Sequence, residues 1–400
     1  MGFITHLPGT VPVVRPERHP KAKGVGVIGL HEGRTLLLSL ATRTAFAHPV
    51  AGCDLNAEKV AASRAELPGV FFTSDYAEML RRPDVDIVAI YTPDKHHAEH
   101  ISMAFEAGKD VICTKPLVIS VKDAKRVLEA GRRTGRKLLV GQSSRFFEPF
   151  RRQRAAFERG EIGKVELLDA HYIHRMDWYY EKSPWVATDT DWVFLGLSHP
   201  LDLVRWYLGQ IKEVHATASR SAIGEKYKLK GNDIYLVNAV ARSGQIGRAM
   251  GHYGVHELPS ARNCVELMLY GSAGSSLAQY HDMKYIHTAP PHTPDHPAEV
   301  KVEEAHAGFN AGELEEVTED CLYAGRHYYF NSEVHGMHYG EFANYADYFA
   351  RSLMSNTAYS PNLEEGLETF CLMEAVRRSS LEGRRVEVAP IMTEVGLEVG

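Results

Sequence analysis

The 400-residue sequence lacks the long apolar runs and the paired cysteines of membrane and disulfide-bonded proteins. No stretch approaches the ~18 consecutive apolar residues that a membrane-spanning helix needs. The cysteines are odd in number, widely spread and without a C-x-x-C pair, which argues against a disulfide framework or a cysteine zinc site; they are Cys53, Cys113, Cys264, Cys321 and Cys371. The N-terminal segment carries its charges after its apolar residues, the reverse of a secretory signal. We therefore expect a chain without a membrane segment in a reducing, cytoplasmic setting.

The sequence also lacks a basic excess, because its formal net charge is −6 at pH 7. This charge balance gives no excess of positive charge that would attract nucleic acid or an anionic membrane surface. A hydrophobic content of 44% and a charged content of 24% are typical of a folded globular enzyme. At roughly 100–200 residues per domain, the length predicts two or three domains.

Histidine is abundant, with 21 residues, and this raises the question of a metal site. His252 and His256 have the spacing of metal ligands on a helix, but the sequence around them has the pattern of a strand. In a strand, residues four apart are separated by about 13 Å, too far for one ion. His335 and His338 lack the neighbouring carboxylates of a zinc helix. We therefore predict no metal.

The domain organisation follows from the change in hydrophobic periodicity along the chain. After an N-terminal extension (1–23), residues 24–144 alternate short buried strands with amphipathic helices, which indicates a Rossmann domain with a doubly wound parallel sheet. From 145 to 400, long period-two segments predict an α+β domain with a large open, mostly antiparallel sheet. Helices are expected there chiefly at 200–208 and in a pair near the end. The overall fold class is α/β.

The cofactor loop is predicted after the first strand. A literal G-x-G-x-x-G over residues 24–29 precedes and enters that strand, so it is not the phosphate loop. The loop expected from position is Gly29, His31, Gly33 and Arg34, with His31 and Arg34 where glycines are usual. Asp54 ends the second strand 25 residues beyond Gly29 (54 − 29), near the ~20 expected of the acid that binds the adenosine ribose. This carboxylate favours NAD over NADP; a turn without ligand, and Asp54 as a helix cap, stay as alternatives.

Several further motifs together resemble the Gfo/Idh/MocA family of sugar oxidoreductases, from about residue 25 to 388. They are Thr92-Pro93 with His97, Thr114-Lys115-Pro116, Gln142, Arg145-Phe146, and His199-x-x-Asp202. The resemblance implies that Lys115 and His199 face the nicotinamide and the sugar, with Thr92, Pro93, His97, Lys115 and Gln142 lining the cofactor site. One position departs from the family, which commonly has an aspartate where this chain has Leu195. Asp189, Asp191 and Asp202 are the candidates to replace it.

Lys115, His199 and Asp202 are the predicted catalytic residues. Lys115 follows a buried strand, where burial and the nicotinamide cation disfavour its charged form and help it bind a hydroxyl. Asp202 lies three residues after His199 on one expected helix face, where it stabilises the imidazolium. A surface lysine and a histidine that merely completes a helix turn are the alternatives.

The substrate site is predicted after the first strand of the second domain, where aromatic and polar groups suit a pyranose. Its candidates are Arg145, His171, His174, Arg175, Asp177, Trp178, Tyr179 and Asp191. Arg145, Arg175 and Lys284 also allow an anionic substituent on the sugar.

The leading functional prediction is an NAD-dependent enzyme that oxidises a secondary ring hydroxyl of a sugar or glycoside. The first alternative is a redox-neutral NAD-dependent glycoside hydrolase, which oxidises C3 transiently, eliminates the C1 substituent and adds water, on an anionic sugar such as a sulfoquinovoside. The second is a cofactor-binding regulator without turnover. A small carbohydrate substrate and a homo-oligomer are expected, the oligomer by analogy with the family.

Overall fold

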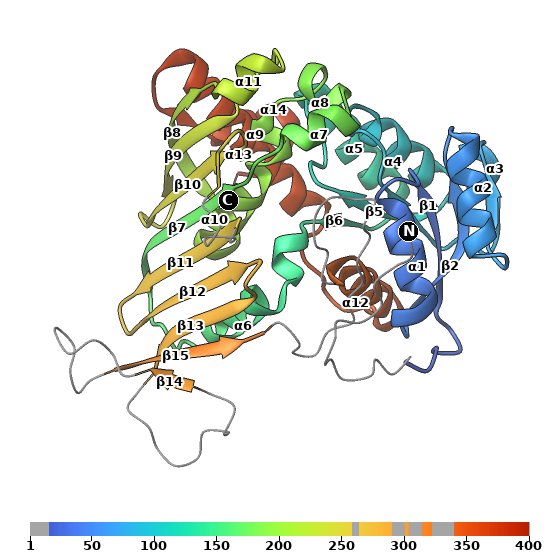
Figure 1. Cartoon of the computed structure of the whole chain (residues 1–400), viewed down its shortest axis with the longest axis horizontal. Helices are drawn as coiled ribbons and strands as arrows, with labels where there is room; N and C mark the ends of the chain where they lie inside the picture. Colours follow the sequence, from blue (N-terminus) through green and yellow to red (C-terminus); the bar gives the residue numbers. More distant parts are fainter. Residues whose placement is uncertain (1–15, 258–263, 290–300, 304–313, 322–339, 400) are drawn as a thin grey trace. The chain divides into compact units, whose positions relative to one another are not determined.

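A computed structural model describes residues 16–257, 264–289, 301–303, 314–321 and 340–399 (Figure 1). The chain divides into two compact units. The first contains residues 1–143, 326–370 and 395–397, and the second contains residues 144–325, 371–394 and 398–400. Most of the predicted N-terminal extension (residues 1–15) and the histidine pair at 335 and 338 lie outside the described residues.

The first unit is built on a six-stranded sheet in the order β3-β2-β1-β4-β5-β6, with every pairing parallel. This order confirms the predicted doubly wound sheet. Its strands are β1 (Lys23–Ile28), β2 (Ala47–Cys53), β3 (Phe71–Thr73), β4 (Ile87–Ile90), β5 (Asp110–Thr114) and β6 (Leu138–Gly141). Its helices are α1 (Gly33–Arg43), α2 (Ala57–Glu66), α3 (Tyr76–Leu80), α4 (His97–Glu106), α5 (Val121–Thr134) and α12 (Glu341–Ser355), with a short 3-10 turn η1 (Asp94–His96).

Helix α12 comes late in the sequence yet packs in the first unit, against α1, β2 and β6. Asp347 of this helix accepts a hydrogen bond from the Phe46 amide at 2.6 Å. The Tyr345 hydroxyl bonds the Tyr91 hydroxyl in the core. The C-terminal sequence therefore supplies part of the core of the first unit.

The second unit is built on a ten-stranded sheet in the order β14-β15-β13-β12-β11-β7-β10-β9-β8-β16. Only the β10–β7 pairing is parallel among the described strands, so the sheet is mostly antiparallel, as predicted. The strands are β7 (Val165–Ile173), β8 (Ile211–Ser219), β9 (Ile234–Ala241), β10 (Ile246–His252), β11 (Val265–Gly271), β12 (Ser275–Tyr280), β13 (Lys284–Ala289), β14 (Lys301–Glu303), β15 (Glu315–Asp320) and β16 (Val386–Glu387).

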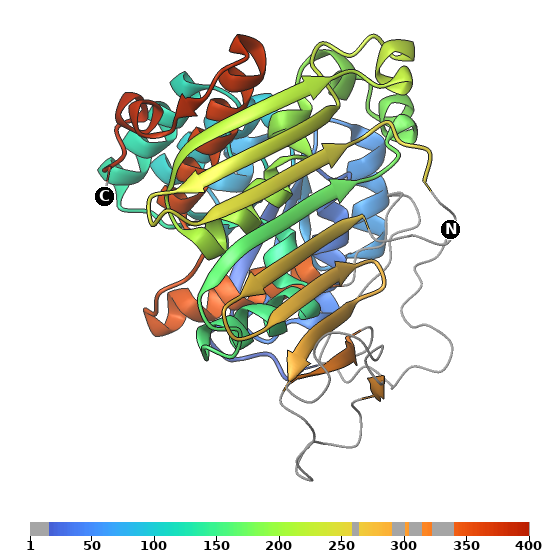
Figure 2. The same ribbon diagram turned by 90° about the vertical axis from the view of Figure 1, so that its left-hand side faces the viewer.

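Helices cover one face of this sheet, and Figure 2 shows the other face turned to the viewer without a helix of the described chain in front of it. The covering helices include α6 (Glu148–Glu158), which packs on β12 and β13, and α10 (Ser198–Leu208), which packs on β7, β10 and β11. The remaining helices are η2 (Ser143–Phe146), α7 (Asp177–Lys182), α8 (Trp185–Thr188), α9 (Trp192–Leu195), α11 (Ala222–Lys226), α13 (Leu363–Glu382) and α14 (Ala389–Val395). The alternation of buried and exposed residues along β9 follows directly from this one-sided cover.

Helix α6 was not expected from the sequence, because a glutamine lies in the middle of its buried face. Gln153 is fully buried, and its amide donates to the carbonyl oxygens of Leu267 and Ser276, both at 3.0 Å. These bonds satisfy polar atoms that burial otherwise penalises. A polar residue therefore takes a position that the helical pattern reserves for an apolar one.

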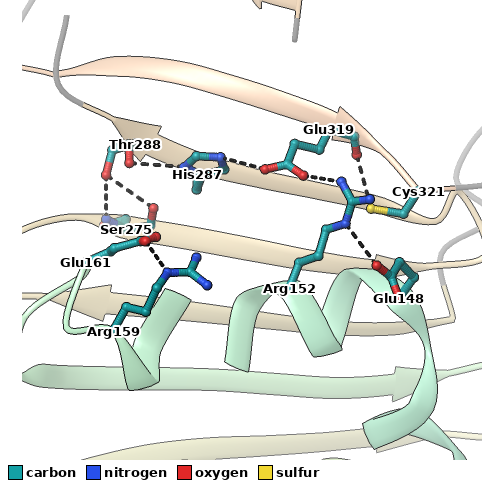
Figure 3. A network of polar contacts seen from close by, with 9 residues as sticks. All are labelled: Glu148, Arg152, Arg159, Glu161, Ser275, His287, Thr288, Glu319 and Cys321. Carbon is teal, nitrogen blue, oxygen red and sulfur yellow. Dashed lines mark hydrogen bonds and ion pairs between the residues drawn. The ribbon is translucent and has the colours of Figure 1, made fainter. Parts of the chain in front are cut away.

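A network of charged side chains anchors the outer strands of the sheet to α6 (Figure 3). Arg152 of α6 bonds Glu148 at 3.1 Å and also pairs with Glu319 of β15. His287 of β13 bonds Glu319 from the other side at 3.1 Å. Burial alone raises the pKa of Glu319, but the bonds from His287 and Arg152 hold that pKa below its ordinary value. The network therefore keeps a half-buried carboxylate charged between two strands and a helix.

All five cysteines lie within the described residues, and each is free and buried. No helix within the described ranges is long and apolar enough to cross a membrane.

Candidate functional site

The turn between β1 and α1 has the geometry expected of a phosphate loop. Gly26 lies inside β1, as predicted, whereas Gly24 lies inside the strand and not before it; the turn begins at Gly29 with φ = +92°. A Cβ at Gly29 would lie 2.6 Å from the Tyr91 carbonyl group, at the end of β4. Glycine is required here both for the positive φ and for this close approach. The turn therefore lies where the strand order reverses, the position at which such sheets bind ligands.

Helix α1 begins at Gly33 without a hydrogen bond from a capping side chain. A Cβ at Gly33 would lie 2.6 Å from Val27 Cγ1, so this glycine allows the helix to pack closely on β1. The amide groups of an uncapped first turn are suited to an anionic phosphate. Arg34 of α1 pairs with Glu66 of α2, so its guanidinium is directed toward α2. His31 lies half-buried in the turn.

Asp54 follows β2 and lies beside this turn. Its carboxylate accepts from the Leu30 amide at 2.7 Å and from the Asn56 amide at 2.8 Å. Asn56, not Asp54, is the N-cap of α2. The structure thus places a carboxylate next to the turn between β1 and α1, where the sequence analysis expects the ribose-binding acid.

Lys115 and Gln142 follow neighbouring strands. Thr114 of β5 pairs with Gly141 of β6, so the residues after them extend from the same edge of the sheet. Lys115 is partly exposed, yet burial of its amine lowers its pKa, while Glu32 and Asp94 act to raise it. The Gln142 side chain is only 3% exposed, and its carbonyl oxygen has no hydrogen-bond partner among the described residues. This edge therefore holds an amine of reduced basicity next to a buried acceptor that a ligand can satisfy.

His97 connects the ends of β4 and β5. Its Nδ1 lies 2.7 Å from the Pro116 carbonyl oxygen and its Nε2 lies 2.8 Å from the Thr92 carbonyl oxygen. The ring is 1% exposed, and burial lowers its pKa while the Asp94 carboxylate opposes this effect. The structure therefore gives His97 a position between the Thr92-Pro93 turn and the segment that carries Lys115.

In the second unit, His199 lies on α10 and contacts residues of two other elements. Its Nδ1 bonds the Ser144 hydroxyl of η2 at 2.8 Å. The Tyr172 ring of β7 meets the imidazole edge-to-face, with centroids 5.3 Å apart. Ser144 is 1% and His199 7% exposed. His199 is therefore held by a hydroxyl and an aromatic ring.

Asp202 pairs with an arginine, whereas the sequence suggested that it acts on His199. Its two carboxylate oxygens accept from Arg145 Nε at 2.6 Å and from the second terminal nitrogen of Arg145 at 2.8 Å. Both side chains are 2% exposed. Arg145 reaches Asp202 from η2, a contact that helical spacing along α10 does not predict.

The other two candidates for the missing family aspartate also have partners elsewhere. Asp191 caps α9 through the Val193 amide at 3.0 Å and accepts from the Tyr235 hydroxyl at 2.6 Å. Asp189 accepts from the Thr188 hydroxyl at 2.9 Å. Asp191 is therefore a helix cap in this structure, and the bond recorded for His199 Nδ1 comes from Ser144.

Aromatic residues at the end of β7 and in the segment after it form a cluster near His199. Tyr172, which the sequence analysis did not select, has its ring 6.5 Å from the His174 ring. Trp178 lies next to His174 and Tyr179, with ring centroids 6.5 and 5.3 Å away. His171 instead points to the sheet face opposite Tyr172, because neighbours in a strand point to opposite faces, and its Nε2 lies 3.7 Å from the Glu266 carboxylate. Period-two alternation was the signal that could have selected Tyr172.

The arginines considered for an anionic substituent are each bound to a carboxylate. Arg145 binds Asp202, and Arg175 binds Asp177 at 2.6 Å. Lys284 begins β13, opposite Asp320 of β15. His174 likewise bonds Glu257 at 2.5 Å. These pairs favour an uncharged polar ligand. Among the described residues, no group of three histidine, cysteine or acidic side chains could hold a metal ion.

Together, the parallel sheet, the uncapped helix after β1, the acid after β2 and the lysine after β5 define a dinucleotide-binding oxidoreductase unit, followed in the chain by a unit with a large open sheet. Residues 23–142 match the oxidoreductase family with an NAD-binding Rossmann fold, and residues 150–275 match the GFO/IDH/MocA C-terminal domain. The chain belongs to the GFO/IDH/MocA family and has an NAD-binding Rossmann domain, as the sequence motifs predicted.

Several curated relatives are dehydrogenases, and this chain matches them over part of their length. A segment of 188 residues is 35% identical to inositol 2-dehydrogenase 3 of Saccharopolyspora erythraea, covering 46% of this chain and 53% of the relative. A segment of 185 residues is 30% identical to 1-carboxy-3-chloro-3,4-dihydroxycyclo hexa-1,5-diene dehydrogenase of Comamonas testosteroni, covering 45% and 46%. The chain thus spans about half the length of the curated relatives it matches.

Solved structures share the fold over nearly the whole chain. An oxidoreductase from Agrobacterium radiobacter in complex with NAD+, L-tartaric acid and magnesium has a TM-score of 0.75 at 19% identity, covering 92% of this chain and 99% of that one. Levoglucosan dehydrogenase in complex with NADH and levoglucosan has a TM-score of 0.74 at 20% identity, with the same coverage. These likenesses establish the fold.

Proposed function

We propose that this protein is an NAD-dependent dehydrogenase that oxidises a secondary ring hydroxyl of an uncharged sugar, glycoside or cyclic polyol. The observation that carries the proposal is the pair of strand ends with Lys115 and Gln142, in an NAD-binding domain. The dehydrogenase names of the curated relatives, among them inositol 2-dehydrogenases, support it.

The residues of the first unit suit NAD. The first turn of α1 offers amide groups to the pyrophosphate, and Asp54 offers a carboxylate to the ribose hydroxyls while repelling a 2′-phosphate. The Gln142 carbonyl oxygen suits the amide N–H of a nicotinamide carboxamide. When bound, NAD+ accepts the hydride from the substrate carbon.

The protein side chains then have to bind the substrate hydroxyl and accept its proton. Lys115 binds the hydroxyl through an amine of lowered pKa, which lets it exchange a proton more readily than an exposed lysine. We assign the acceptance of the hydroxyl proton to His199. The carbinol carbon loses a hydride to NAD+ and the hydroxyl loses a proton, so the products are a ketone, NADH and a proton.

The substrate is proposed to be uncharged because Arg145 and Arg175 already bind carboxylates. Aromatic rings beside polar groups, as in Trp178, Tyr179 and His174, suit the apolar and hydroxylated faces of a sugar ring.

The test is a panel of inositols, free sugars and p-nitrophenyl glycosides, each with and without added NAD. NADH absorbance that rises with substrate supports the dehydrogenase. Release of nitrophenol without net NADH overturns the proposal in favour of the redox-neutral glycosidase. If neither absorbance changes with any substrate, the result favours a cofactor-binding regulator without turnover. Lys115→Ala should abolish turnover while leaving NAD binding, measured by calorimetry, largely intact. Normal turnover in that variant contradicts the site assignment.

We further propose that the uncovered face of the second sheet binds a second copy of this chain. Four large apolar side chains are exposed on it, namely Leu167, Leu236, Ile246 and Tyr270. The same face also carries the Arg248–Asp169 ion pair, so it presents both charge signs, and such a surface can pair with its own copy across a two-fold axis.

Light scattering after size-exclusion chromatography tests this interface. Ile246→Glu should lower the molar mass by disrupting the apolar patch. Leu381→Glu is the matched control, because Leu381 is an exposed leucine on α13. A monomeric wild type, or equal masses for both variants, contradicts the proposal.

A further inference from the structure

A histidine and a carboxylate pair with each other just after β7. His174 Nδ1 lies 2.5 Å from a Glu257 carboxylate oxygen, and the same oxygen accepts from the Arg175 backbone amide at 2.7 Å. The His174 amide also donates to the carbonyl oxygen of His252, the last residue of β10, at 3.0 Å. The backbone and the ring of His174 are therefore both attached to the end of β10 and the segment after it.

The direction of the ring's hydrogen bond follows from the charge of Glu257. Burial acts to raise the pKa of this carboxyl group, but the bonds from the Arg175 amide and the His174 ring hold that pKa below its ordinary value. Glu257 is therefore a carboxylate at neutral pH, and a carboxylate only accepts hydrogen bonds. His174 Nδ1 carries the hydrogen of this bond, so in the neutral ring Nε2 is the acceptor.

Aromatic rings surround the His174 imidazole. The Tyr172 ring is nearly parallel to it, with centroids 6.5 Å apart, and the rings of Trp178 and His281 meet it edge-to-face at 6.5 and 6.1 Å. The His174 side chain is 23% exposed, and its Nε2 has no hydrogen-bond partner among the described residues. Nε2 is therefore the polar atom of this ring that a ligand can reach.

Alternation along the strand places His174 on the same sheet face as Tyr172. The two residues are two positions apart, and the backbone bond to His252 continues the β7–β10 pairing as far as His174. The Tyr172 ring also contacts the His199 ring, with centroids 5.3 Å apart. Two histidines thus adjoin one aromatic ring, an arrangement that suits a substrate with several hydroxyl groups.

We propose that Glu257 is the positioning residue of His174, holding Nδ1 so that Nε2 accepts a hydrogen bond from a substrate hydroxyl other than the one oxidised. The carboxylate fixes both the orientation and the tautomer of the ring. The enzyme then selects substrates with a second hydroxyl group, because an analogue without it leaves Nε2 unpaired. The inference rests on the proposed function, since it takes His174 as part of the substrate site.

The first test observes the ring directly, without turnover. Nitrogen NMR of histidine-labelled protein distinguishes Nδ1–H from Nε2–H rings, and His174→Phe identifies the signals. The wild type should show the Nδ1–H tautomer at high pH. Glu257→Ala should mix the two tautomers, whereas Glu257→Gln should keep Nδ1–H, because its amide oxygen still accepts the bond. Glu225→Ala, which removes a carboxylate paired with Arg220 in the same unit, is the control.

The second test measures selectivity with monodeoxy analogues of the inositol or sugar that yields NADH in the panel described above. For one analogue, kcat/KM of the wild type should be about 10-fold lower than for the parent substrate. Glu257→Ala and His174→Phe should lose this ratio, mainly through a higher KM for the parent, and Glu257→Gln should restore it. A structural role alone would lower kcat for all substrates alike and leave the ratio unchanged, which overturns the proposal.

The two tests separate the inference from the proposed function. If no substrate yields NADH, the proposed function fails, while the tautomer measurement still decides the role of Glu257. An Nε2–H ring in the wild type, or a tautomer unchanged in Glu257→Ala, overturns that role whatever the activity. If circular dichroism shows that Glu257→Ala does not fold, the wild-type tautomer and the selectivity of His174→Phe decide the proposal.

Discussion

Replacing Asp202 with leucine should destabilise the second unit strongly, because it leaves the Arg145 guanidinium in a buried site without its carboxylate. Both side chains are 2% exposed, and two hydrogen bonds join them. Removing one partner of a buried ion pair typically costs about 3–5 kcal/mol. The guanidinium also lies 5.0 Å from the Trp206 ring centroid, and this contact survives the change. We therefore expect the free energy of unfolding to fall by an amount near the lower end of this range, about 3 kcal/mol.

The double variant provides the control for this reasoning. Replacing both Arg145 and Asp202 with leucine removes the buried charge together with its partner. Apolar replacement of a whole buried pair is often neutral or stabilising. The double variant should therefore be more stable than the Asp202→Leu variant, even though it carries one more substitution.

Tryptophan fluorescence during urea unfolding is the appropriate assay. All four tryptophans, at positions 178, 185, 192 and 206, lie in the second unit, so their emission follows that unit alone. At a slope of about 2.5 kcal/mol per M, a loss of 3 kcal/mol lowers the urea midpoint by about 1.2 M. A shift below about 0.4 M, or a double variant less stable than the single one, refutes the argument from burial.

Three further predictions concern the first unit. Gly33→Ala should cost about 1–3 kcal/mol and weaken NAD binding, because its Cβ would lie 2.6 Å from Val27 Cγ1; calorimetry tests this, with Gly69→Ala, whose Cβ meets nothing within 4 Å, as the control. Burial lowers the pKa of His100 to about 4, so below pH 6.5 the unfolded chain takes up a proton that the folded chain refuses, and stability falls between pH 6.5 and 4. His100→Gln should reduce that fall by about 2 kcal/mol in thermal melts, and an unchanged slope contradicts this. Asp54→Ser should lower the preference for NAD over NADP in binding titrations, and an unchanged ratio contradicts the ribose assignment.

Much of the first unit was predictable because its strands are buried on both faces. Runs such as residues 25–30 and 87–91 contain only apolar residues and glycine, and a glycine or a charged residue stands directly before each run. Each predicted strand was found within a few residues of its expected position. The short helix α3 and the incorporation of α12 were not foreseen, since a sequence pattern does not say which distant helix completes a core.

The second unit contains contacts that a sequence pattern does not predict. Alternation along β7 fixes that His171 and Tyr172 point to opposite faces, but the covering helix α10 decides that Tyr172 is the one near His199. Likewise, the Gln153 amide nitrogen donates to strands more than 100 residues away, so the local sequence does not predict its place on a buried helix face.

The sequence by itself determined the family, the parallel sheet, the turn after the first strand and the identity of the residues at the strand ends, because these depend on local periodicity and on motifs with fixed spacing. Only the tertiary structure decided the partners of those residues. Asp202 is three residues from His199 along the helix, yet it binds Arg145, and His199 binds Ser144, 55 positions earlier. The physical reason is that a buried charge or imidazole takes the partner that folding brings within hydrogen-bond distance, whatever its separation in the chain.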